Sequence, residues 1–196
     1  MSGRVTILSH SSTSATNAAG FPDDEPLDTR GAGWAAEARG RVHRPTRVRS
    51  SPAPAARQTA AALGLVDQVE PLLRDWDLGR WRGRTLDEVA AAEPDGVSAW
   101  LSAPAAAPHG GEPLVDLLAR TAGWLAALPG DGHTVAITHP AVVRAVVLAV
   151  LGAPPAGFWR IDIAPLTATV LRGGPCRWTL RSTGRHLASR PGDDPD

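Results

Sequence analysis

The sequence predicts an α/β protein: a three-layer α/β/α arrangement in which a mostly parallel central sheet carries helices on both faces. Two observations lead to this prediction. Short apolar runs alternate along the chain with longer segments of helical character, which is the pattern of βαβ units and a parallel sheet. The first of these runs is almost entirely apolar and β-branched, as expected for a strand that is covered on both faces.

The N-terminal half begins with this strand, at residues 5–8. A polar segment with several proline and glycine residues follows at 14–31, and we expect it to be a connection. A helix is expected over 32–39 and a second strand over 46–51. An alanine-rich helix then follows over 54–65, where a glycine provides its stop signal.

The middle of the chain is irregular at 72–85, because two glycines interrupt any helix there. A short helix over 86–94 is expected to end at its proline. Leucines at helical spacing predict a long helix over 111–130. A buried strand at 133–138 then leads into a strongly apolar helix at 140–151, whose proline lies in the first turn, where its missing N–H costs nothing.

Three closing strands are expected at 158–163, 167–172 and 176–182. We expect residues 1–187 to form one domain, which is long enough to bury a full core. The polar segment 188–196 is expected to be a disordered tail.

The composition restricts the function classes. Positive and negative side chains balance to a net charge of zero, so the chain lacks the basic surface that nucleic acid or an anionic membrane requires. The single cysteine, Cys176, excludes an internal disulfide and a cysteine-rich metal cage. No segment is long and apolar enough to be a signal sequence or a membrane span. We therefore expect a cytoplasmic protein that recognises its partner through a local site.

Two histidines occupy equivalent positions. His10 and His139 each follow directly after an apolar strand. In an open α/β sheet the carboxyl ends of the strands form the ligand crevice, so both imidazoles are expected in one pocket. A facing pair there could supply a nucleophile, a base or an acid near neutral pH. Each taken alone could equally be a loop histidine with a satisfied hydrogen bond.

A carboxyl group between the two histidines could act as proton donor. Asp75 and Asp77 lie in the stretch LLRDWDLGRWRGRTLDEV, where Trp76 and Trp81 could form an apolar wall that raises a carboxyl pKa. The alternative is a surface aspartate in an arginine-rich turn.

With these features the sequence resembles the histidine phosphatase superfamily, which has the phosphoglycerate-mutase-like fold. The resemblance runs from Val5 to about Pro155, and five blocks occur in the family's order. They are the first strand with its histidine, SSPAPAARQTAAALGL, LLRDWDLGRWRGRTLDEV, HGGEPLVDLLARTAGWL and VAITHPAVVRAVVLAVLGAP.

The resemblance implies a role for each candidate residue. His10 would attack phosphorus and become a phosphohistidine, Asp75 would protonate the leaving oxygen, and His139 would stabilise the transferring group. It also implies a small phosphorylated metabolite as substrate, with no metal and no organic cofactor. The oligomeric state stays open, a homodimer included.

The sequence departs from the family where phosphate is bound. The family's first motif is Arg-His-Gly, and this chain has Ser9 and Ser11 around its histidine. The position of the second phosphate-binding arginine aligns with Ala55. Ser12 replaces the usual glutamate, whereas Thr13 fits the family pattern. Since phosphoryl transfer depends on neutralising the charge of the phosphate oxygens, the loss of both arginines bears directly on activity.

Other arginines could supply this charge. Arg49 ends the second strand and is the best replacement, because strand ends point into the crevice. Arg57 is expected to face elsewhere on its helix, since two residues turn a side chain by about 200°. Arg144 is expected to be a surface or helix-dipole charge. We expect the substrate to contact Arg49 together with the hydroxyls of residues 9, 11, 12 and 13.

Three functions stay open. The first is a divergent phosphatase that works through His10, with a reduced need for charge or a replaced arginine. The second is a repurposed acid–base enzyme that uses His10, Asp75 and His139 on a small molecule without phosphate. The third is a catalytically inactive binding or regulatory protein on an inherited fold.

Overall fold

The computed structural model describes residues 3–174 and 177–187. Within these residues a six-stranded sheet has the order β3-β2-β4-β1-β5-β6. Strands β1 to β4 pair in parallel, while β5 pairs antiparallel with both β1 and β6. The sheet is therefore mixed and mostly parallel, as the sequence predicts. Its strands are β1 (Gly3–Ser9), β2 (Arg47–Ser50), β3 (Gln68–Val69), β4 (His133–Thr138), β5 (Thr167–Gly174) and β6 (Arg177–His186).

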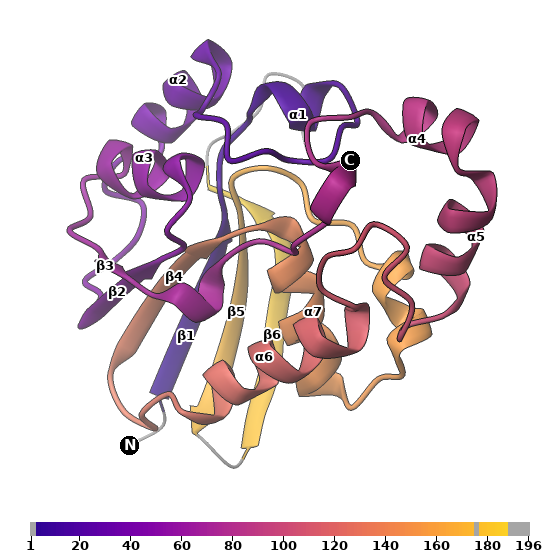
Figure 1. Cartoon of the computed structure of the whole chain (residues 1–196). Helices are drawn as coiled ribbons and strands as arrows, with labels where there is room; N and C mark the ends of the chain where they lie inside the picture. Colours follow the sequence, from indigo (N-terminus) through magenta and orange to yellow (C-terminus); the bar gives the residue numbers. More distant parts are fainter. Residues whose placement is uncertain (1–2, 175–176, 188–196) are drawn as a thin grey trace, which may run out of the picture.

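Helices lie on both faces of this sheet (Figure 1). Three short 3-10 helices, η1 (Pro71–Leu73), η2 (Gly79–Trp81) and η3 (Pro155–Arg160), lie in the connections. The α-helices are α1 (Ser14–Asn17), α2 (Thr29–Glu37), α3 (Pro54–Ala62), α4 (Leu86–Ala92), α5 (Pro94–Ser102), α6 (Leu114–Ala126) and α7 (Pro140–Leu151).

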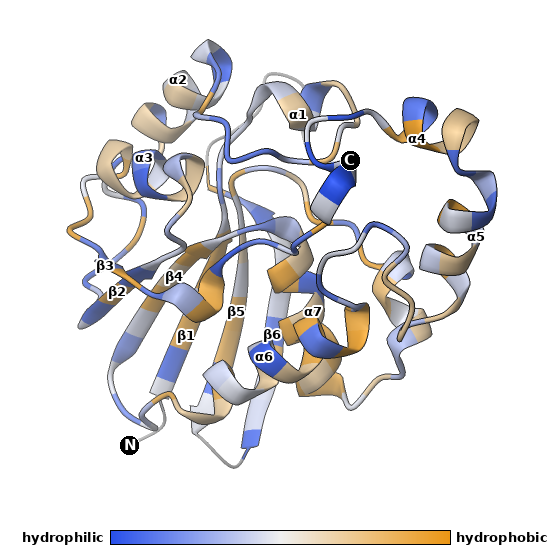
Figure 2. Cartoon of the chain, in the orientation of Figure 1, coloured by the Kyte–Doolittle hydropathy of each residue, from blue (hydrophilic) through white to orange (hydrophobic). Residues whose placement is uncertain are grey.

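The core is divided by the sheet into two clusters. Ile7 and Ala136 point to the face covered by α6 and α7, whereas the next residues, Leu8 and Ile137, point to the face covered by α2 and α3. This alternation is the two-residue period of a strand. Both faces of β1 and β4 are buried, which explains their nearly continuous apolar sequences. Figure 2 shows α7 as mostly apolar, in agreement with its buried position.

The register of the central strands brings three chain segments to one edge of the sheet. In the parallel pair β1 and β4, Ser9 lies opposite Thr138, so the residues that follow, His10 and His139, leave the sheet side by side. The His10 backbone N–H donates to the Thr138 carbonyl over 2.8 Å. On the other side of β4, the Ser51 backbone N–H donates to Ile137. The crevice expected from the sequence therefore forms at this edge.

The predicted strand at 158–163 is wrong, because Phe158 and Trp159 belong to the 3-10 helix η3 and residues 161–163 are irregular. Both rings contact Trp76. A strand would send consecutive side chains to opposite faces and could not place both rings in one cluster.

Two helix boundaries also differ from prediction. Pro94 begins α5, a helix that the sequence analysis did not predict, rather than ending the preceding one. The segment predicted as a connection contains α1 and the start of α2, where the Asp28 carboxylate accepts from the Gly31 N–H over 2.6 Å. This is an ordinary N-cap.

None of the helices in the described residues has both the length and the apolar composition needed to cross a membrane. The segment 188–196, predicted as a disordered tail, lies outside the described residues, as does Cys176.

Gly31 sets the distance between α2 and the loop that follows β1. A Cβ atom at Gly31 would overlap the backbone of Ser12, whereas one at Gly33, in the same helix, would meet nothing within 4 Å. We expect Gly31→Ala to lower the free energy of unfolding by about 1–3 kcal/mol through overpacking. The matched change Gly33→Ala is expected to raise it by up to about 1 kcal/mol. Urea unfolding followed by circular dichroism measures both, and equal effects would contradict this close approach.

Candidate active site

His10 is held as a neutral imidazole directly after β1. Its Nδ1 lies 2.7 Å from the Ser11 carbonyl oxygen. This oxygen can only accept, so Nδ1 carries the hydrogen and Nε2 keeps its lone pair. Burial, reinforced by the nearby His139, lowers the pKa of His10 to about 4. At neutral pH the ring is therefore uncharged, with Nε2 available as a nucleophile.

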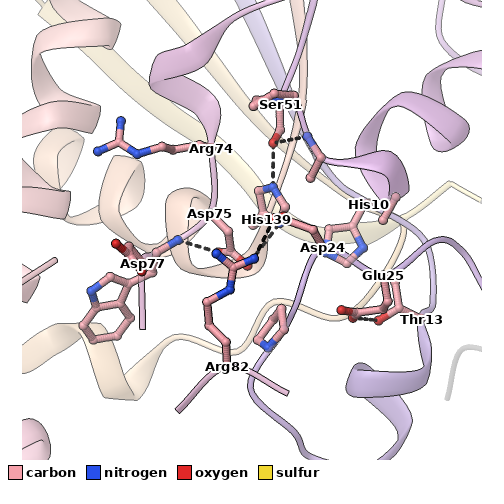
Figure 3. A pocket seen from close by; sticks show the side chains of 15 residues that line it. His10, Thr13, Asp24, Glu25, Ser51, Arg74, Asp75, Asp77, Arg82 and His139 are labelled. Atoms are coloured by element: carbon pink, nitrogen blue, oxygen red, sulfur yellow. Dashed lines mark hydrogen bonds and ion pairs between the residues drawn. The ribbon is translucent and has the colours of Figure 1, made fainter. Parts of the chain in front are cut away.

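His139 lies beside His10 and connects two further side chains. The ring centroids of the two histidines are 5.1 Å apart in an edge-to-face arrangement. Nε2 of His139 lies 2.7 Å from the Ser51 hydroxyl, and its Nδ1 lies 3.2 Å from an Asp75 carboxylate oxygen, an ion-pair distance. The carboxylate, imidazole and hydroxyl thus form a continuous chain (Figure 3).

Asp75 is a carboxylate in this setting. Burial alone would raise its pKa, but the charge of His139 and contact with its ring, together with the backbone N–H of Trp76, hold that pKa below its usual value. The Trp76 N–H donates to the carboxylate over 2.8 Å. Asp75 therefore lies where the sequence places it, beside both histidines, but it is ionised in the free protein at neutral pH.

Three of the predicted substrate-binding serines do not line the pocket. The Ser9 hydroxyl donates to the Ala164 carbonyl over 2.7 Å, on the β5 side of the sheet. The Ser11 N–H donates to the Thr59 hydroxyl over 3.0 Å, and the Ser12 hydroxyl donates to the Asp28 carboxylate over 2.7 Å. None of the three lines either cavity of the site, so these contacts hold the loop after β1 in place instead of facing a ligand.

Thr13 does face the pocket. Its hydroxyl donates to the Glu25 carboxylate over 2.8 Å, and the Asp23 N–H donates to the other oxygen of this carboxylate. Burial alone would raise the pKa of Glu25, but these two hydrogen bonds outweigh it and lower that pKa. Glu25 is a pocket residue that the sequence analysis did not find, because its position depends on how the 20–28 segment folds back.

Arg49 is not in the pocket, contrary to the prediction. It lies opposite Ala136 and Gln68 within the sheet, before the edge where the site forms. Its side chain lines a separate hollow and donates to the Val48 carbonyl over 3.3 Å. The residue at the strand end that reaches the site is Ser51 instead.

The pocket has two lobes. The polar lobe is a cavity of about 280 Å³ that His10 and His139 both line. Ala55, aligned with the family's second arginine, lies on its wall. The charged side chains of the polar lobe are the carboxylates Asp24, Glu25, Asp75 and Asp77 and the guanidinium groups of Arg74 and Arg82.

Both arginines of the polar lobe are already paired. Arg82 binds Asp24 at 2.7 Å and Asp23 at 3.1 Å, and Arg74 approaches Glu112 at 3.3 Å. From the sequence, this stretch is an arginine-rich turn in which neither arginine is assigned to the site. The only sequence feature that points to these two arginines is their proximity to Asp75.

The aromatic lobe is a second cavity, of about 220 Å³, which shares His10, Asp75 and Trp76 with the polar lobe. Arg144 lines it, half-buried, although the sequence analysis placed this residue at the surface. The remaining side chains of the lobe are mostly apolar and include Leu78, Trp100, Phe158 and Trp159. Within the described residues, no three histidine, cysteine, aspartate or glutamate side chains converge as a metal site requires.

The fold and the paired histidines agree with the comparison to known proteins. Residues 5–185 match the model of the histidine phosphatase superfamily (branch 1). The chain therefore belongs to the histidine phosphatase superfamily.

The similar proteins include glucosyl-3-phosphoglycerate phosphatases. The one from Mycolicibacterium vanbaalenii is 34% identical over 125 residues, 56% of this chain and 55% of that one. The one from Mycobacterium tuberculosis is 33% identical over 106 residues, 48% of each. The chain thus matches about half the length of these curated relatives. A mycobacterial glucosyl-3-phosphoglycerate phosphatase solved with inorganic phosphate is 28% identical, with a TM-score of 0.79 over 95% of this chain and 99% of that one.

The lowered pKa of His10 makes stability depend on pH. The unfolded chain takes up a proton at this imidazole near pH 6.5, and the folded protein only near pH 4. Between these values the unfolded state binds more protons, so the free energy of unfolding falls as the pH drops. We expect His10 to contribute a loss on the order of 3 kcal/mol across this window.

The change His10→Asn is expected to remove this part of the pH dependence. Urea unfolding of both proteins between about pH 4 and pH 7 measures it, because other titrating groups contribute equally to the two curves. Parallel curves for the two proteins would show that His10 titrates normally in the fold.

Proposed function

We propose that this protein is a phosphatase that hydrolyses a small phosphate monoester through a phosphohistidine at His10. The observation that carries the proposal is the hydrogen bond from His10 Nδ1 to the Ser11 carbonyl. It fixes the tautomer in which Nε2 has the lone pair, and the lowered pKa keeps that lone pair free at neutral pH. A nucleophile needs both conditions.

The proposed reaction has two steps. In the first, His10 Nε2 forms a bond to phosphorus, the bond from phosphorus to the ester oxygen breaks, and the leaving oxygen takes a proton. In the second, water attacks the phosphohistidine and releases phosphate. The proton would come from, and return to, the Asp75–His139 pair, whose carboxylate oxygen and Nδ1 lie 3.2 Å apart beside His10.

The charge on the phosphate oxygens must be met by residues other than those at the family's arginine positions. Arg82 is the best placed, since it lines the polar lobe and its guanidinium is partly exposed. It would exchange part of its pairing with Asp23 and Asp24 for the phosphate. Such a single cation can be worth roughly 10³–10⁵ in rate.

A second candidate is an acid–base enzyme on a substrate without phosphate. The polar lobe supports it, because its four carboxylates outnumber its two arginines and disfavour a dianion. The chain from Asp75 through His139 to Ser51 would then carry protons.

Trapping tests the phosphohistidine directly. A panel of radiolabelled phosphate monoesters, glucosyl-3-phosphoglycerate included because of the similar proteins, is mixed with the enzyme and quenched in alkali. We expect an acid-labile label on the wild-type protein and none on His10→Asn, with activity reduced at least about 10³-fold. Full turnover by His10→Asn, or no label and no turnover with any ester, would reject the proposal.

Restoring a cation tests the role of charge. Ala55 lines the polar lobe, so the side chain of Ala55→Arg can place a guanidinium beside the reacting group. We expect kcat/KM for phosphate esters to rise at least about 10-fold, since charge on the phosphate oxygens limits the reaction. The neutral variant Ala55→Gln controls for bulk. If Ala55→Arg gains nothing over Ala55→Gln, the site does not use phosphate and the second candidate is favoured.

A further inference from the structure

The aromatic lobe is lined by a compact group of rings next to His10. The aromatic cluster consists of Trp76, Trp100, Phe158 and Trp159. Trp76 stacks on Trp100 at 5.4 Å between centroids, and Trp100 meets Trp159 edge to face at 4.6 Å. These contacts fix the rings as a rigid wall. The cavity they border, about 220 Å³, is small compared with the roughly 300–1,000 Å³ of pockets for drug-sized ligands.

Arg144 places a positive charge in this apolar surrounding, without an ion-pair partner in the part of the chain that the structure describes. It lies on α7, one turn into the helix that begins after His139, and its guanidinium carbon is 5.7 Å from the Phe158 ring centroid. Its Nε is buried and has no hydrogen-bond partner within the described residues. Burial lowers the pKa of Arg144, and the charge of Asp162 offsets this only in part.

This arrangement is costly unless something completes it. A buried donor without a partner destabilises a protein by about 1–3 kcal/mol, and more when the group is charged. An apolar side chain in place of Arg144 would fill the same space without this cost to the folding free energy. The guanidinium fork binds a carboxylate through two parallel hydrogen bonds, which are stronger when water is excluded. The missing partner of Arg144 is therefore expected from a ligand that enters the lobe.

We propose that the aromatic lobe binds the alcohol part of the substrate, and that this part is a single ring bearing a carboxylate that pairs with Arg144. A cavity of this size holds a single ring. The aromatic cluster packs against the apolar face of that ring, and Arg144 pairs with the carboxylate that the ring bears. Because His10 lines both lobes, the phosphate would lie in the polar lobe with the ester bond between them. The placement of the phosphate rests on the proposed function, whereas the ring and carboxylate site stands on the aromatic lobe alone.

A matched pair of substrates tests the assignment. The esters 4-carboxyphenyl phosphate and 4-carbamoylphenyl phosphate have the same shape and differ in the charge at the ring. We expect the wild-type protein to prefer the carboxylate in kcat/KM, and Arg144→Gln to reduce this preference about 10-fold. The ratio of the two kcat/KM values is compared between the wild-type protein and the variant, so the different intrinsic reactivities of the two esters cancel. Arg49→Gln, which removes an arginine outside the pocket, is the control and should keep the wild-type ratio.

If Arg144→Gln slows both esters equally, Arg144 acts on the phosphate group and the proposal is overturned. If Arg144→Gln hydrolyses both esters with the wild-type ratio of kcat/KM, the carboxylate site is likewise overturned, whereas the proposed phosphatase activity is supported.

A binding measurement makes the test independent of turnover. Benzoate carries the ring and the carboxylate without phosphate, and binding is followed by the fluorescence of the tryptophans in the aromatic cluster. We expect benzoate to bind the wild-type and Arg49→Gln proteins, and to bind Arg144→Gln at least about 10-fold more weakly. Binding of this kind without hydrolysis of any ester would reject the proposed function and keep the ring site. Equal affinity in all three proteins would reject the ring site.

Discussion

The site depends on the parallel pairing of β1 with β4. Because Ser9 lies opposite Thr138, the chains leave the sheet together, and the hydrogen bond from the His10 N–H to the Thr138 carbonyl extends the ladder into the site itself. A shift of one residue would turn every side chain of β1 to the other face. The positions of both histidines are therefore fixed by the same strand pairing and apolar contacts that bury the sheet.

Much of this could be read from the sequence. Apolar strands followed directly by His10 and His139 were sufficient to predict that the two rings meet, since the carboxyl ends of parallel strands share an edge. Asp75 needed the family resemblance, because nothing local distinguishes it from Asp77. The failures concern residues placed by long-range packing. Arg49 is expected at a strand end, but it lies inside β2 and misses the site. Arg144 lines the site together with Phe158 and Trp159, which the 3-10 helix η3 brings back to α7.

Charge is distributed unevenly around His10. The polar lobe has more carboxylates than arginines, and each arginine there is paired. A dianion entering this lobe meets repulsion from Asp24, Glu25 and Asp77 as well as attraction from Arg82. The family's two arginines would make the guanidinium groups as many as the four carboxylates of the lobe. Ser9 and Ala55 are both uncharged and cannot do so, and the Ser9 hydroxyl is bonded to the Ala164 carbonyl. For the proposed phosphate ester, binding energy must then come from another part of the molecule.

The aromatic lobe is where such energy is available. It joins the polar lobe at His10 and Asp75, buries apolar surface, and contains the one pocket arginine without an ion-pair partner among the described residues. Interactions with a remote part of a substrate can offset the cost of bringing its reacting group into an unfavourable position. A site with weak phosphate binding and strong binding of the alcohol part would act slowly on simple phosphate esters. It would discriminate sharply among substrates, because only the correct ring and charge would hold the ester against His10.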